Sequence, residues 1–335
     1  MLNNIVSYLV KSHTFVNVKS CLPDAIPDDC VRVKYLYCGI CGGDYSRYLG
    51  YRTEYPISLG HEFVAQVLGC NCSETVDFKI GDFVVSDFNY RCNNCSYCHK
   101  GKTHLCAQND IGMFTNRAFS VYADIHYSYL TKINSSINPI YRATAIEPLS
   151  CILHAMDNYD LSKIKRILIY GVGNIGMLSA FYLHNCCKKE VYIFDTFQEK
   201  CALVARTLGC DVATLNHDYD LIIEATNNAK GLLSCIMDSE YNQSICSFSH
   251  LYGQNTDGIY TALVKKETRI YFPLRNGSKD NLSRAAQIIE SNWSTREDCL
   301  IKIFETNDVS LPFESKKECV HPKQVIKFKV DPKID

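Results

Sequence analysis

Three side chains in the first quarter of the chain have the chemistry of a metal site. Cys41 is expected in a glycine-rich turn, and His61 and Glu62 directly follow Gly60. A thiolate, an imidazole and a carboxylate are ligand types that zinc takes in proteins, and a site with few protein ligands leaves a position open for a substrate. A buried thiol and a strand-end histidine would be the more common explanation of these residues if nothing else accompanied them. Together they predict a catalytic metal site that the rest of the chain must fold and serve.

A second set of thiols follows. Cys92, Cys95, Cys98 and Cys106 have the spacing C-x2-C-x2-C-x7-C. Four thiolates can surround one Zn²⁺ tetrahedrally and leave no position open, which is typical of a structural zinc site. An iron–sulfur cluster is the alternative, but the ferredoxin pattern places proline after its last cysteine, and here Ala107 occupies that position. The spacing therefore predicts a structural zinc lobe over residues 90–107.

Composition limits the class of protein. The chain has 335 residues, 47% of them hydrophobic, with a formal net charge of −1. This length suits two domains, and the near-zero charge argues against a nucleic-acid partner. No apolar run approaches a membrane span, and the first residues lack the pattern of a signal peptide. Most of the nineteen cysteines are scattered, as small buried residues in a reducing cytoplasm would be.

The positions of apolar residues predict two kinds of structure. Val31–Tyr37, Phe63–Leu68 and residues 118–133 alternate or cluster as strands do, so the first part of the chain is expected to be rich in β-structure. The tail, Val325–Val330, alternates again and is expected to return to this β-rich part. Between them, residues 244–251 and 269–274 read as further strands, and Ser283–Glu290 as a helix.

A dinucleotide-binding unit is predicted in the second part. The continuous apolar run Ile167–Tyr170 leads into a G-x-G-x-x-G turn and a helical stretch over Met177–His184; a second buried strand, Val191–Phe194, then ends at Asp195. A single βαβ unit that contains a strand, the glycines, a helix, a second strand and a terminal acid is a specific signal for dinucleotide binding. The acid would repel a 2′-phosphate, which favours NAD(H) over NADP(H). The cofactor-binding candidates are Gly171, Gly173, Asn174, Ile175, Gly176, Asp195, Lys200 and Thr226.

These motifs together resemble the zinc-containing medium-chain dehydrogenase/reductase family over nearly the whole chain. The matching segments occur in the family's order, and they are 39–44, 60–62, 81–82, 92–106, 147–149 and 171–176. The resemblance implies an α/β protein with a GroES-like, β-rich catalytic domain over 1–146 and 281–335, and a Rossmann domain, a doubly wound parallel sheet, over 147–280. It also implies an active site between them that links alcohol oxidation to NAD(P).

The resemblance gives a role to Glu147, which by itself could be only a charge at a helix start. In the sorbitol and threonine dehydrogenase branch, a Glu-Pro motif here supplies a zinc ligand or holds a zinc-bound water, so Cys41, His61 and Glu147 become the expected ligands and Glu62 an exchangeable one. Asp44 is expected to orient the site, and Cys151 to face the nicotinamide. The sequence departs from the family at Gly43 and Ser46, where a hydroxyl and a histidine usually form a proton relay. It also has Arg117-Ala118 in place of a frequent Gly-Gly, and the segment 209–220 is shorter than usual.

The sequence therefore predicts a cytoplasmic, homodimeric or homotetrameric enzyme with two zinc ions per chain. It would transfer hydride between NAD(H) and a polyol, a sugar alcohol or a related secondary alcohol or ketone. Three alternatives stay open. One is a reductase of a keto-sugar or cyclitol, with Arg47 and Arg52 binding a phosphate or carboxylate, although ordinary surface charge is the favoured explanation of these arginines. The others are a catalytically inert NAD-binding homologue and a thiol-rich redox sensor.

Overall fold

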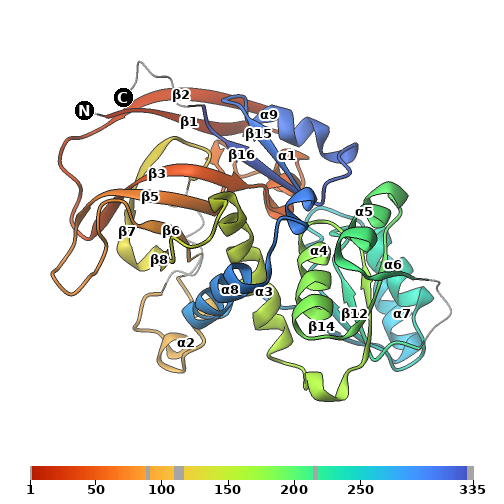
Figure 1. The fold of residues 1–335 in the computed structure, drawn as a ribbon. Coiled ribbons are helices and arrows are strands. Elements are labelled where there is room, and N and C mark those ends of the chain that lie inside the picture. The colour runs from red at the N-terminus through yellow and green to blue at the C-terminus, as the bar shows by residue number, and fades with distance from the viewer. Residues whose placement is uncertain (1, 88–90, 109–116, 214–217, 330–335) are drawn as a thin grey trace.

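The computed structural model describes residues 2–87, 91–108, 117–213 and 218–329. Three sheets organise them. Figure 1 shows the β-rich half on one side and a second sheet flanked by helices on the other, with α3 (Ile146–Met156) and α8 (Lys279–Asn292) between the two. The predicted boundaries at 146/147 and 280/281 fall within these two helices and stay a prediction.

The β-rich half contains a seven-stranded sheet and a three-stranded sheet. The larger sheet has the order β15-β16-β3-β5-β6-β8, with β7 also paired to β3, and the smaller one has the order β2-β1-β4. The strands of this half are β1 (Leu2–Lys11), β2 (Thr14–Leu22), β3 (Cys30–Gly39), β4 (Ile57–Ser58), β5 (Glu62–Asn71), β6 (Phe83–Ser86), β7 (Tyr122–His126), β8 (Leu130–Ile133), β15 (Ile301–Glu305) and β16 (Lys323–Lys327).

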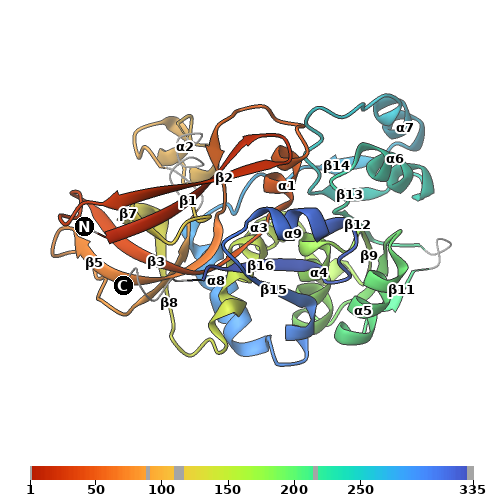
Figure 2. The ribbon, with the colours of Figure 1, turned by 90° about the horizontal axis from the view of Figure 1, so that it is seen from above.

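The C-terminal strands complete the larger sheet, as the alternation of apolar residues in the tail predicts. Val330, the last residue of the predicted strand, lies outside the described residues. Val325 of β16 is paired with Gly39 of β3, antiparallel, and β15 runs parallel to β16. Figure 2 shows β15 and β16 lying between the β-rich half and the second, helix-flanked sheet. The last strand therefore reaches the segment that precedes Cys41.

The second sheet is entirely parallel, with the order β11-β10-β9-β12-β13-β14. This is strand order 3-2-1-4-5-6, the order of a Rossmann fold. Its strands are β9 (Arg166–Tyr170), β10 (Glu190–Phe194), β11 (Asp211–Val212), β12 (Leu221–Glu224), β13 (Ser244–Ser247) and β14 (Arg269–Tyr271). Its helices are α4 (Asn174–Ala180), α5 (Gln198–Leu208), α6 (Ala229–Asp238) and α7 (Ile259–Lys266).

Some local predictions need correction. The expected glycine-rich turn at Cys41 is the start of a helix, α1 (Gly42–Tyr48), and Glu147 lies in the first turn of α3. The helix predicted over Met177–His184 starts earlier, at Asn174, and changes to a π-helical turn, Phe181–Cys186. Apolar periodicity marks the buried face of a helix, but capping contacts decide where it begins.

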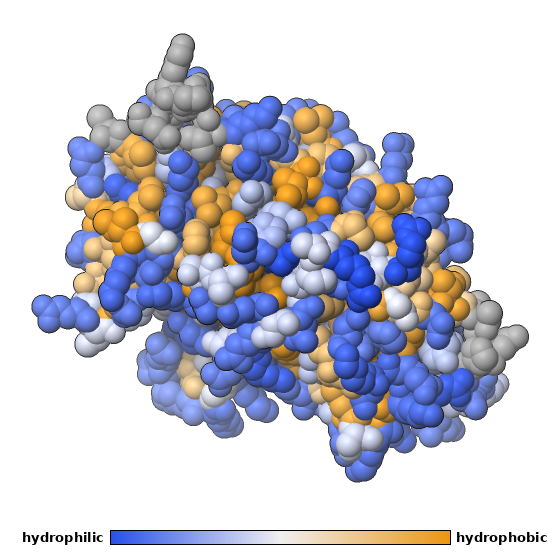
Figure 3. Space-filling view, in the orientation of Figure 1, coloured by the Kyte–Doolittle hydropathy of each residue, from blue (hydrophilic) through white to orange (hydrophobic). Residues whose placement is uncertain are grey.

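The described residues form three hydrophobic clusters. One packs inside the β-rich half, and a second, shared by the two halves, runs from Val64 and Val85 through α3 to the Rossmann sheet. The third packs that sheet against α6 and α7. On the face in Figure 3, hydrophilic residues predominate and hydrophobic ones are interspersed. Among the residues that the structure describes, no helix is long and apolar enough to cross a membrane. The shared core joins the two halves through α3, which carries Glu147.

Candidate metal and cofactor sites

Cys41 lies at the N-terminus of α1, where its side chain caps the helix. The Gly43 N–H donates to Cys41 Sγ at 3.4 Å, and the Cys41 N–H donates to Asp44 Oδ2 at 3.2 Å. This reciprocal arrangement satisfies backbone donors that a helix start would leave without partners. It also fixes the direction of the thiol. Burial raises the pKa of Cys41, and the neighbouring His61 opposes that shift.

His61 and Glu62 lie beside Cys41, so that one ligand atom of each residue falls within 4.8 Å of the others. His61 Nδ1 is 3.8 Å from Asp44 Oδ1. Burial would lower the pKa of His61, but Asp44 and Cys41 outweigh it and raise that pKa well above its ordinary value. The predicted orienting residue Asp44 therefore contacts the backbone of one donor and lies next to the ring of another.

Glu62 is held by two residues from distant parts of the chain. Lys323 Nζ, at the start of β16, lies 2.8 Å from Glu62 Oε2, and both side chains are almost fully buried. Asn174, the first residue of α4, donates from Nδ2 to both carboxylate oxygens at 3.1 and 3.3 Å. The sequence motifs did not indicate Lys323. Asn174 was expected to contact only the cofactor, yet it connects the glycine turn to the metal-site candidates.

Glu147 lies outside the group formed by Cys41, His61 and Glu62. It is buried in the first turn of α3, and its Oε1 accepts a hydrogen bond from Cys151 Sγ at 3.5 Å. Burial raises the pKa of Glu147 to about 7, while the nearby His61 opposes the shift. The structure thus places Glu147 and Cys151 near the three candidates but does not bring the Glu147 carboxylate within the same ligand spacing.

The donor set fits a zinc ion. Sulfur, nitrogen and oxygen donors converge, and burial raises the pKa values of Cys41 and Glu147 because negative charge is unfavourable there. A divalent cation would reverse that balance, since it stabilises the thiolate and the carboxylate directly. The residues that could hold it are Cys41, His61 and Glu62, with Glu147 adjacent.

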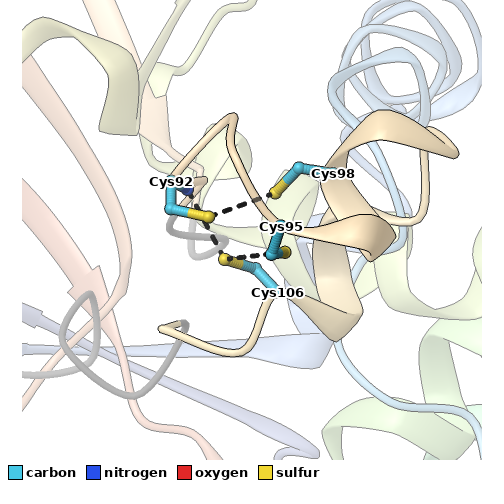
Figure 4. Close-up of side chains that lie close together, drawn as sticks. All are labelled: Cys92, Cys95, Cys98 and Cys106. Carbon is cyan, nitrogen blue, oxygen red and sulfur yellow. Dashed lines mark hydrogen bonds between the residues drawn. The ribbon is translucent and has the colours of Figure 1, made fainter.

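The four cysteines of the predicted lobe also converge, as Figure 4 shows. Cys92 Sγ lies 3.9 Å from Cys98 Sγ, and Cys95 Sγ lies 4.0 Å from Cys106 Sγ. Zinc–sulfur bonds of about 2.3 Å in a tetrahedron put the sulfurs about 3.8 Å apart. Backbone N–H groups lower the pKa of Cys95 to about 6, whereas burial and neighbouring thiols raise that of Cys98 to about 12. One thiolate is therefore favoured, and a cation is needed to stabilise four.

The glycine turn has the shape that a dinucleotide requires. A Cβ on Gly176 would lie 1.8 Å from the carbonyl oxygen of Gly171, so the close approach of α4 to β9 admits no side chain there. A Cβ on Gly173 would meet nothing within 4 Å. The open space at Gly173 lies at the N-terminus of α4, where backbone N–H groups can bind a pyrophosphate.

The remaining cofactor candidates surround this turn. Asp195 follows β10, and its carboxylate accepts from the Val172 N–H and the Phe197 N–H, both at 2.8 Å. It therefore secures the glycine turn as well as standing where a ribose is expected. Thr226, after β12, donates to Glu224, and Lys200 Nζ stacks 5.1 Å from the ring centroid of Phe197. Ile175 packs against the shared core.

Comparisons with known proteins agree with this architecture. Residues 27–135 match the alcohol dehydrogenase GroES-like domain family. The chain is 32% identical to a sorbitol dehydrogenase of Halalkalibacterium halodurans over 45% of this chain and 44% of that protein. It is 30% identical to galactitol 1-phosphate 5-dehydrogenase of Escherichia coli K12, over 68% and 63%. An alcohol dehydrogenase from Thermotoga maritima has the same fold, with a TM-score of 0.80 at 17% identity, covering 98% of this chain and 100% of that one.

These findings confirm the α/β fold class and the resemblance to the zinc-containing medium-chain dehydrogenase family. The matches to curated relatives span about half of their length, from 44% of the sorbitol dehydrogenase to 63% of the galactitol 1-phosphate enzyme. The activity of the whole protein is accordingly a proposal, developed next.

Proposed function

We propose that the protein is a zinc-dependent, NAD-linked dehydrogenase of polyols, sugar alcohols or related secondary alcohols and ketones. One observation carries this proposal: Asn174, at the N-terminus of the helix that follows the glycine turn, hydrogen-bonds Glu62 of the candidate zinc group. A dinucleotide on that turn would therefore extend toward a metal-bound substrate. The relatives named sorbitol dehydrogenase and galactitol 1-phosphate 5-dehydrogenase support a polyol as the substrate class.

The chain's own residues divide the work. Zinc, when bound, supplies a Lewis acid for the alcohol oxygen, and NAD⁺, when bound, accepts the hydride. Cys41, His61 and Glu62 are proposed to hold the metal with Glu147, while Asp44 orients His61 and Lys323 neutralises Glu62. The glycine turn holds the cofactor phosphates, and Asp195 the adenosine ribose.

The proton must leave by an unusual route. Gly43 has no hydroxyl, and Ser46 Oγ already donates to the Gly42 carbonyl at 3.1 Å and accepts from Asn227 Nδ2 at 3.0 Å. Ser46 therefore fastens α1 instead of relaying a proton. We infer that the proton leaves through water and a glutamate, and Glu147, buried beside His61, is the candidate.

A panel of polyols and simple alcohols, assayed with NAD⁺ and the zinc-loaded protein, tests the proposal. We expect polyols to reduce NAD⁺ in the presence of the zinc-loaded protein, and we expect this activity to disappear when zinc is removed. An inert homologue would bind NADH and turn over nothing. Outside the four-cysteine group, burial raises the pKa of Cys151, Cys201, Cys210, Cys235 and Cys246, which argues against a redox sensor that uses these thiols. Oligomeric state and cellular location stay predictions.

Replacing Cys95 with serine tests the second zinc. Loss of one of four thiolates should release this ion and unfold the loop from Cys92 to Cys106, because such lobes depend on their metal for structure. Elemental analysis is expected to show one zinc fewer per chain, and the melting temperature should fall. Activity per folded molecule should change less. Iron in place of zinc, or an unchanged zinc content, would contradict the assignment. Exposed Cys299, changed to serine, is the control and should change neither quantity.

Replacing Asp195 tests the cofactor preference. Asp195→Ala removes both the charge and the contacts to Val172 and Phe197, so NADH binding should weaken roughly 10- to 100-fold, the effect of losing hydrogen bonds to a charged group. Asp195→Asn keeps a hydrogen-bond acceptor but removes the charge, so its main effect should be a smaller difference between the affinities for NADH and NADPH. Fluorescence titration of both cofactors measures this. Equal affinity of the unchanged protein for NADH and NADPH would refute the preference.

A further inference from the structure

Arg47 is buried without a partner that satisfies it. The residue is 4% exposed, although the sequence favoured an ordinary surface charge, and that expectation is wrong for Arg47. Its Nε and Nη2 are shielded from solvent and donate no hydrogen bond to any described residue. A guanidinium presents its donors in a planar fork that fits an oxyanion. Buried donors of this kind are costly unless something accepts their hydrogens.

Neighbouring carboxylates do not neutralise Arg47 fully. Glu54 Oε2 is 4.0 Å from Arg47 Nε, but the Glu54 side chain is half exposed and makes its shorter contact, 3.0 Å, with Arg52. Asp44 points its oxygens at the Cys41 N–H and toward His61. Burial, together with the charge of Arg52, lowers the pKa of Arg47. Arg47 therefore keeps two buried donors, Nε and Nη2, that the neighbouring carboxylates do not satisfy.

The position of Arg47 connects it with the substrate end of the site. It lies in the last turn of α1, the helix that Cys41 caps, and Cys41 and Asp44 both influence its pKa. Its neighbour Ser46 is bonded to Asn227, which follows β12, and Arg52 stacks over Tyr252, which follows β13, at 4.7 Å from the ring centroid. These contacts are on the β12–β13 side of the Rossmann sheet.

The adenosine half of a dinucleotide belongs on the other side. Asp195 follows β10, across β9 from β12, and the ribose is expected there. Arg47 therefore stands beside the expected nicotinamide and substrate, away from the cofactor's ribose acid.

We propose that Arg47, assisted by Arg52, binds an anionic group of the substrate, a phosphate ester or a carboxylate, so that the substrate is an anionic polyol or the corresponding ketone. This inference rests on the proposed function, because it specifies the substrate of the same site. The oxyanion would accept from the two unsatisfied guanidinium donors and draw Arg52 from Glu54. Reaction at the metal would then occur at a hydroxyl whose position is set by its distance from the anion.

Paired substrates test the proposal in the zinc-loaded protein. kcat/KM is compared for a hexitol, its 1-phosphate and an aldonate of equal chain length, with NAD⁺. The phosphate and carboxylate arms decide which anion is preferred. One of the two anionic compounds should exceed the neutral hexitol, and Arg47→Leu should reduce that preference roughly 10- to 100-fold, as expected for hydrogen bonds to a charged group. Arg47→Lys keeps the charge but not the planar fork of donors, so its preference for the anionic compound should lie between those of the unchanged protein and Arg47→Leu. Arg284→Leu, at a partly exposed position of α8, is the matched control and should keep the preference.

The outcomes separate this inference from the proposed function. If the neutral and anionic compounds are oxidised equally and Arg47→Leu affects them alike, the anion site is wrong and the polyol dehydrogenase stands. If no alcohol is oxidised, the proposed function fails. Titration with inorganic phosphate then decides the anion site, since binding must be present in the unchanged protein and lost in Arg47→Leu. If Arg47→Leu weakens NADH binding more than it reduces the preference for the anionic substrate, Arg47 belongs to the cofactor site and the inference is overturned.

Discussion

Replacing Lys323 with methionine is expected to destabilise the protein by about 3–5 kcal/mol, the cost of leaving one partner of a buried ion pair. Lys323 and Glu62 lie 2.8 Å apart with 0% and 1% of their side chains exposed, so no water can replace the lost ammonium group. Asn174 would remain as the one other described donor to this carboxylate. Urea denaturation of the zinc-loaded protein measures the change.

A surface pair is the control for this prediction. Lys79 Nζ is 3.5 Å from Asp77, and both side chains are mostly exposed, so Lys79→Met should cost less than about 1 kcal/mol. Adding Glu62→Gln to Lys323→Met should restore part of the stability, because the double variant no longer buries an unpaired charge. If Lys323→Met costs no more than Lys79→Met, the ion pair does not support the site in the way described.

Replacing Glu147 with alanine is expected to remove the catalytic zinc and abolish alcohol oxidation, while the zinc of the four-cysteine group stays. A carboxylate near Cys41, His61 and Glu62 gives the metal an oxygen-rich shell, which holds zinc less firmly than two thiolates would. The zinc content measured by elemental analysis should fall from two ions per chain to one. In cobalt-substituted protein, the absorption from the Cys41 site should disappear and that from the four thiolates should persist.

Glu199→Ala is the matched control for Glu147→Ala. Glu199 also stands in the first turn of an eleven-residue helix, α5, but it is exposed and distant in sequence from any candidate ligand. Its loss should remove only a favourable helix-dipole interaction of about 0.3–1 kcal/mol. Should Glu147→Ala keep both metals and full activity, Glu147 would be the same kind of helix-start charge, and the assignment to the polyol branch would lose its main support.

The parts of the site that the sequence predicted are those in which neighbouring residues carry the chemistry. Cys92, Cys95 and Cys98 are close in space because they are close in the chain, and the glycine turn is a property of one strand, one turn and one helix. Strand order follows from the same regularity, because a G-x-G-x-x-G turn between buried strands belongs to a doubly wound sheet. Such local patterns need no knowledge of the rest of the molecule.

The parts that were missed depend on distant contacts. Lys323 meets Glu62 across 261 positions and Asn174 meets it across 112, and neither pairing leaves a trace in spacing or periodicity. Arg47 reads as a surface residue because its own helix is short and polar. The segment before Ile57 folds back onto it: Glu54 Oε2 lies 4.0 Å from Arg47 Nε, and the Tyr55 hydroxyl donates to the Arg47 carbonyl oxygen at 2.7 Å. Exposure of a charged side chain is thus set by tertiary structure.

The ion pair between Glu62 and Lys323 also has a consequence for the order of events during synthesis. At about 5–20 residues per second, roughly 13 to 50 seconds separate the two residues on the ribosome. The Rossmann sheet, which spans one continuous stretch from β9 to β14, is translated within that interval and can fold before the half that precedes it. Glu62 acquires its counter-charge only when β16 adds to β3. A nascent chain stalled before Lys323 should therefore bind the dinucleotide before it can complete its zinc pocket.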